Sequence, residues 1–140
     1  MGGRGTFAAG NPVDFLYEID KSFSADGTWE GVKILKGKEG SGKHGLPESS
    51  HSSEAYLKLE PDGTFRELRL YDKSHALYLE IAYTIEKSLT GNRHEKVLHY
   101  HTYDSRFSKN KDGPFSRSKA KLLTEPMKEQ YKKYFRGLNI

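Results

Sequence analysis

Apolar and polar residues alternate with the period of two that is typical of β-strands between residues 55 and 103. This pattern predicts four strands, at residues 55–60, 64–71, 76–87 and 96–103. Short turn-forming segments separate them, and Pro61 and Gly63 in the first of these favour a tight hairpin. Four strands in sequence with short connections predict an antiparallel meander.

The two ends of the chain complete the expected architecture. Residues 14–19 and 28–35 read as two further strands that could extend the sheet. Near the C-terminus, Thr124 is a good N-cap, and apolar residues recur on one stripe until Gly137. We expect a helix of about three turns packed against the sheet, and therefore an α+β fold.

Three segments lack the pattern of a core element. Residues 1–13 are rich in glycine and small side chains and are expected to form a flexible arm. Residues 36–54 are polar, with many Gly and Ser, and predict a mobile loop. Residues 104–121 predict a basic loop. The chain from residue 14 to residue 140 is then a single domain.

Strand alternation also predicts which side chains share a face of the sheet. Leu98 and Tyr100 match the leucine-rich face that the helix would cover. The opposite face would collect Arg69, Tyr71, Tyr78, Glu80, His99, His101 and Tyr103. This second set could also be an ordinary, partly solvated sheet face that the N-terminal strands cover.

The mixture of acid, base, cation and aromatic groups on that face suggests chemistry on RNA. His99, His101 and Glu80 are candidate acid–base catalysts for attack by a ribose 2′-hydroxyl, which requires no metal. The candidate RNA-binding residues are Arg69, Arg106 and Arg117 as phosphate ligands, and Tyr71, Tyr78 and Tyr103 as stacking platforms for bases.

A metal site is an alternative interpretation of the same histidines. His99 and His101, with His94 or Asp104, offer donors that suit zinc or manganese. Residues 37–44 resemble a phosphate-binding loop, but His44 stands where the motif needs Ser or Thr, and no helix pattern follows. We therefore predict no cofactor and assign no metal ligand.

Charge and composition narrow the setting further. Of 140 residues none is cysteine, which excludes disulfides and thiolate chemistry. Residues 93–140 hold 12 Lys and Arg against 5 Asp and Glu, while residues 1–92 hold 11 against 14. A basic C-terminal third suggests an anionic partner, nucleic acid foremost. No apolar run could span a membrane, so we expect a soluble, cytoplasmic protein.

Several short motifs resemble those of a group of small proteins from bacterial prophages and integrative elements. They are the start GGRGTFAAGNP, the stretch LRLYDKSHALYLEI, the LHYHTYD strand and the closing LTEPMKEQYKKYFRGL. The resemblance implies a mobile-element setting, with a phage or antidote protein as a conceivable partner. The predicted meander with a basic C-terminal helix is also similar in architecture to the barnase-like and RelE-like nuclease folds.

Three hypotheses follow from the sequence. The first is a small domain that binds RNA, with possible metal-independent ribonuclease activity. The second is a non-catalytic phage accessory or assembly module, and the third is a metal-binding domain. The sequence does not determine the oligomeric state.

Overall fold

The computed structural model describes residues 16–38, 45–47, 50, 53–108 and 115–140, with only the backbone at 105–108 and 115. Its strands are β1 (Tyr17–Ile19), β2 (Thr28–Trp29), β3 (Val32–Gly37), β4 (Ala55–Leu59), β5 (Phe65–Tyr71), β6 (Leu77–Ile85), β7 (Lys96–Ser108), β8 (Phe115–Arg117) and β9 (Lys121–Leu122). The helices are α2 (Lys87–Thr90), α3 (Glu125–Tyr131) and the 3₁₀ turn η1 (Lys132–Tyr134). The α+β prediction is confirmed.

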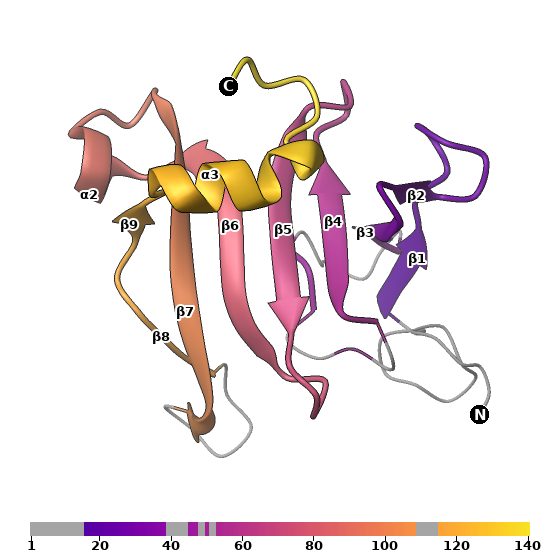
Figure 1. Ribbon diagram of the computed structural model, residues 1–140, viewed down its shortest axis with the longest axis horizontal. Helices are drawn as coiled ribbons and strands as arrows, with labels where there is room; N and C mark the ends of the chain where they lie inside the picture. The colour runs from indigo at the N-terminus through magenta and orange to yellow at the C-terminus, as the bar shows by residue number, and fades with distance from the viewer. Residues whose placement is uncertain (1–15, 39–44, 48–49, 51–52, 109–114) are drawn as a thin grey trace.

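The strands form one sheet in the order β1-β3-β4-β5-β6-β7-β8, in which β9 also pairs with β7 (Figure 1). The predicted antiparallel meander is confirmed from β4 to β7. The N-terminal strands do extend it, but β3 runs parallel to β4, so the sheet is mixed. The strand expected at 28–35 is broken at Glu30 and Gly31, whose positive φ angles of 53° and 80° form a tight hairpin turn.

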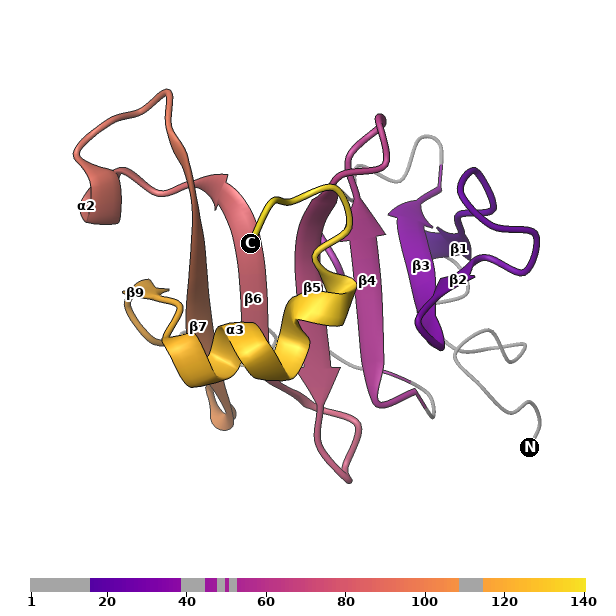
Figure 2. The ribbon, with the colours of Figure 1, turned by 45° about the horizontal axis from the view of Figure 1, so that its top comes forward.

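Helix α3 lies across β5, β6 and β7 on one face of the sheet (Figures 1 and 2). Thr124 caps it as predicted, since its hydroxyl accepts a hydrogen bond from the Met127 N–H at 3.3 Å. The buried core between this helix and the sheet contains Ile34, Leu57, Leu59, Phe65, Leu68, Leu79, Ile81, Leu123 and Phe135. The regular helix is shorter than expected, because it tightens into η1 after Tyr131.

A second, smaller core lies on the opposite face of the sheet. It contains Tyr17, Leu35, Leu46, Tyr56, Tyr71 and Leu77. Leu46 comes from the segment predicted to be a mobile loop, yet only 4% of it is exposed. Residues 45–47 therefore pack against the sheet, and the mobility predicted for residues 36–54 stays a prediction. Residues 1–13, 39–44, 48–49 and 51–52 lie outside the described part.

A β-bulge changes the predicted faces at the start of β6. Leu79 pairs with Leu70, but Tyr71 pairs with Leu77, so Tyr78 is an extra residue on β6. Leu77 therefore joins Tyr71 in the second core, although simple alternation predicted it beside Leu79. Tyr78 leaves the face predicted for it: 43% of it is exposed, and its electrostatic partner is Tyr131 of α3.

The basic segment 104–121 is not the loop that we predicted. Strand β7 continues to Ser108, and the chain returns as β8 and β9 along the same strand. Residues 109–114 lie outside the described part. None of the helices in the described ranges has the length and apolarity needed to cross a bilayer.

Candidate functional site

His99 and His101 occupy the sheet face predicted for them. On β7 they pair with Ala82 and Glu80 of β6, while Leu98 and Tyr100 pack against the helix-side core. The expectation that a ligand can reach the two rings is wrong, because only 3% of His99 and 4% of His101 is exposed. General acid–base catalysis would require a ribose to reach two rings that are almost wholly buried.

Backbone carbonyls fix the orientation of both imidazoles. The Nδ1 of His99 lies 2.8 Å from the Val97 carbonyl oxygen, and the Nδ1 of His101 lies 3.0 Å from that of Ser118. A carbonyl oxygen only accepts hydrogen bonds, so each Nδ1 must carry the proton. In the neutral rings, Nε2 is therefore the nitrogen with an available lone pair.

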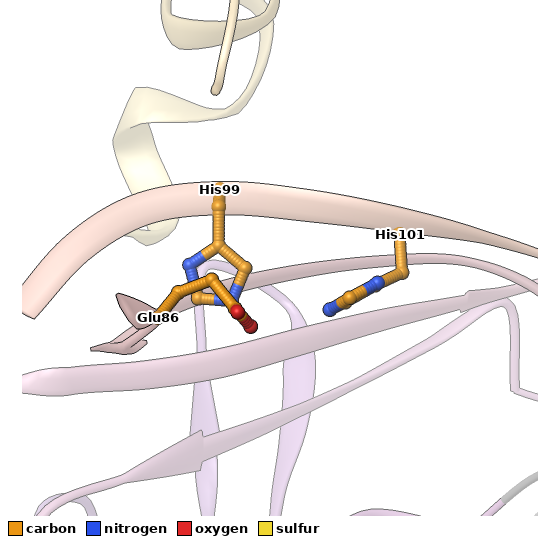
Figure 3. A group of neighbouring side chains, drawn as sticks. All are labelled: Glu86, His99 and His101. Carbon is orange, nitrogen blue, oxygen red and sulfur yellow. The ribbon is translucent and has the colours of Figure 1, made fainter. Parts of the chain in front are cut away.

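Glu86 completes a group of three with these histidines (Figure 3). It follows the last residue of β6, and the ligating atoms of the three residues all lie within 4.8 Å of one another. Its carboxylate accepts a 2.7 Å hydrogen bond from the Ser88 hydroxyl, which lowers the pKa of Glu86, and His99 and His101 lower it further. The carboxylate is thus ionised at neutral pH.

Neither of the additional metal ligands expected from the sequence belongs to this group. His94 is exposed in the turn after α2, where its backbone N–H donates to Asn92. Asp104 lies further along β7, beyond the two histidines. Glu86 was missed, because nothing in the linear sequence shows that the end of β6 turns back over the following strand.

A buried ion-pair network lies beside the histidines. The Nε of Arg69 is 2.7 Å from Glu80 Oε2 and 3.7 Å from Glu67 Oε1. Burial lowers the pKa of Arg69, but the two carboxylates more than offset this and raise it. Burial also raises the pKa of Glu67, and the charge of Glu80 adds to the rise. Glu80 and Arg69 are therefore bound to each other, inaccessible to a substrate.

The same network holds the segment around Leu46 against the sheet. The Leu46 N–H donates to Glu67 at 2.7 Å, and Arg69 donates to the Leu46 carbonyl at 2.7 Å. The hydroxyl of Tyr71 donates to the Pro47 carbonyl at 2.6 Å. Tyr71, predicted to stack on a base, is buried and tethers the chain instead.

The accessible part of the predicted site lies at the edge of the sheet. Tyr103 on β7 pairs with Arg117 on β8, and a hydrogen bond from Arg117 joins the side chains. The ring of Tyr103 is half-buried, and the Arg69 guanidinium lies 5.5 Å from its centroid. A hollow of about 550 Å³ opens here, lined by Thr102, Tyr103, Asp104, Ser116, Arg117 and Ser118.

Burial raises the pKa of Tyr103, and the charge of Glu80 raises it further, against the opposing effect of Arg69 and Arg117. The phenol is therefore neutral at physiological pH. Of the remaining predicted residues, Tyr78 lies on the helix side, and the side chain of Arg106 lies outside the described part.

The structure thus divides the predicted site into three parts. The first part contains Glu86, His99 and His101. The second contains Arg69, Glu80 and Glu67. The third contains Tyr103 and Arg117. No family model matches the chain, and neither the curated proteins nor the solved structures contain a match to it.

Proposed function

We propose that the protein binds single-stranded RNA along the edge formed by β8, β9 and the chain between them. The observation that carries this proposal is the hollow in which Tyr103 and Arg117 lie side by side. A neutral aromatic ring can stack on a base, and a guanidinium can contact the adjoining phosphate.

Exposed cations continue along this edge. Arg117, Lys119 and Lys121 are all exposed, and no acidic residue interrupts the sequence between them. The cations of α3 are less suited to the same task, because Lys128 and Lys132 pair with Glu125 and Glu129 at 2.9 and 3.2 Å. Arg117 shares the face of its partner Tyr103, whereas Lys121 pairs with Tyr100 and lies on the helix side of the same edge, so a strand that follows the edge would meet cations on both sides of it.

The proposal is limited to binding. The rings of His99 and His101 are too deeply buried to reach a ribose, and Glu80 is held by Arg69. Among the described residues that line the hollow, none supplies a pair of groups for proton transfer near neutral pH. RNA that stays intact in the binding assay is the result expected from this geometry.

Fluorescence anisotropy with a labelled single-stranded RNA of about a dozen nucleotides tests the proposal. Combined Arg117→Glu, Lys119→Glu and Lys121→Glu substitutions should weaken binding at least tenfold and should reduce the salt dependence. Loss of three phosphate contacts corresponds to a decrease of about two in the slope of log K against log salt.

The matched control replaces three exposed lysines elsewhere on the surface with glutamate, at Lys21, Lys36 and Lys73. It changes the net charge equally, so it should leave affinity for RNA within about twofold if the edge is the specific site. Equal weakening by the two triple variants would show that only overall charge matters. Wild-type protein that fails to bind RNA would also refute the proposal.

A further inference from the structure

We infer that Glu86, His99 and His101 bind a divalent transition-metal ion, for which zinc is the best fit. The inference is independent of RNA binding, because none of these residues lines the hollow at the sheet edge. It rests on how two donors from β7 and one from the residue after β6 converge, how the two rings are held, and which ion such donors prefer.

The donors come together because of strand pairing. His99 and His101 are two residues apart on β7 and therefore project from the same face. Glu86 leaves the end of β6, directly after Ile85 has paired with Lys96 at the start of β7. Figure 3 shows its carboxylate beside the His99 ring, with the His101 ring directed toward the same space.

The hydrogen bonds to Nδ1 are the second supporting observation. Histidines that bind metals through Nε2 commonly donate the Nδ1 proton to a carbonyl or carboxylate, which fixes the tautomer and the ring direction. Both rings have this arrangement, with the Val97 and Ser118 carbonyls as acceptors. Two ring centroids only 5.6 Å apart, at an interplanar angle of 88°, bring both lone pairs into one small region.

Burial adds a reason for a cation to be present. Two nearly inaccessible imidazoles that both present a lone pair repel each other, and neither can be hydrated as it would be in bulk water. An ion between them replaces this repulsion with two favourable bonds. The Glu86 carboxylate beside them supplies the negative charge that a dication requires nearby.

The donor types select the ion. Imidazole nitrogen and carboxylate oxygen suit zinc and its first-row neighbours, whereas calcium and magnesium prefer oxygen donors alone. Bonds of about 2.1 Å in a tetrahedral site place donors about 3.4 Å apart, so the present spacing of up to 4.8 Å must contract modestly. Glu86 lies between β6 and α2, outside the strand ladder, where a side-chain rotation can provide this contraction.

Within the part of the chain that the structure describes, Glu86, His99 and His101 supply three donors, which leaves one position of a tetrahedral ion for water or a further ligand.

Calorimetric titration of the tag-free, chelator-treated full chain with zinc chloride tests the inference. We expect one ion per chain, and cobalt should give the visible absorption bands of a four- or five-coordinate nitrogen–oxygen site. Glu86→Gln, His99→Ala and His101→Asn should each weaken zinc binding at least tenfold.

The control variants are His75→Ala and His94→Ala, which remove histidines from outside the cluster. They should bind zinc as the wild type does. Glu86→Gln is the decisive variant, because Glu86 lies outside the two cores and its loss leaves the fold intact, as circular dichroism would verify. The inference would be overturned if the wild type bound no stoichiometric zinc. It would also be overturned if all three cluster variants bound zinc as tightly as the wild type.

Discussion

Arg69 neutralises two carboxylates that burial would otherwise make unfavourable. The Nε of Arg69 lies 2.7 Å from Glu80 Oε2 and 3.7 Å from Glu67 Oε1. Removing one member of a buried ionic group costs more than its pairing contributes, since the remaining charges stay buried without a partner. The network is therefore sensitive to any change at the central residue.

Arg69→Met should lower the free energy of unfolding by about 3–5 kcal/mol, measured by urea denaturation. Arg66 provides a matched control on the same strand, because its pair with Glu60 is partly exposed. Arg66→Met should cost no more than about 1 kcal/mol. Similar losses in the two variants would mean that the buried network contributes no more than a surface pair.

Glu67 makes stability depend on pH. A carboxyl whose pKa is higher in the folded state binds its proton more tightly there, so unfolding releases protons. Its contribution therefore decreases as pH rises from the ordinary value of 4.5 through the raised pKa. Glu67→Gln removes this titration and retains an oxygen that can accept from Leu46.

The unfolding free energy of Glu67→Gln relative to wild type should accordingly increase as pH rises from the ordinary value of 4.5 through the raised pKa. Urea denaturation of both proteins at several pH values in this interval measures the difference, and titrations common to both cancel. A constant difference would show that Glu67 has the same pKa in the folded and unfolded chain.

At the scale of elements, the short segment 45–47 is fastened to the second face of the sheet. Leu46 fills part of the second core, and three hydrogen bonds hold the backbone of Leu46 and Pro47. The segment acts as a cover over β4 and β5, so its attachment should contribute to global stability.

Leu46→Ala should destabilise the protein by about 2–5 kcal/mol, as expected for a buried leucine. Leu122, which is mostly exposed on β9, is the matched control, and Leu122→Ala should change stability by less than about 0.5 kcal/mol. Thermal and urea unfolding provide the measurement. A negligible effect of Leu46→Ala would mean that the segment detaches easily.

Alternation of apolar and polar residues was enough to predict the meander and most of its two faces, and the apolar stripe after Thr124 predicted the C-terminal helix, because the cores impose these periodicities. It could not predict the bulge at Tyr78, since an extra residue leaves no mark on a pattern that remains apolar on both sides. Nor could it predict that Leu46 reaches the core or that Glu86 meets the histidines. These contacts depend on how loops return to the sheet.

At the scale of the whole molecule, the two faces of the sheet carry different kinds of side chain. One face and α3 form the larger apolar core, and the other face carries the buried ionic groups and the histidines. The basic C-terminal third contributes both the last strands of the sheet and the helix that covers it. Its cations are therefore shared between the edge, at Arg117, Lys119 and Lys121, and the helical segment 125–134.

The carbonyl of Ser118 connects the histidine cluster to the basic edge of the sheet. It accepts the Nδ1 proton of His101, while Ser118 itself lies between two cations of the edge. Ligation of Nε2 polarises an imidazole and makes its Nδ1–H a stronger donor, which would hold this stretch of backbone more firmly. Occupancy of the ion site and capture of a nucleic acid would then reinforce each other.

Such reinforcement must be reciprocal: the factor by which zinc tightens RNA binding has to equal the factor by which RNA tightens zinc binding. Both factors can be measured by anisotropy and calorimetry on the same preparation, and Glu86→Gln should reduce them to one. Tightening that persists in Glu86→Gln would mean that zinc acts on the RNA directly, without the site on β7. Tightening that is lost in Glu86→Gln would identify the Ser118 carbonyl oxygen as the link between the two proposed sites.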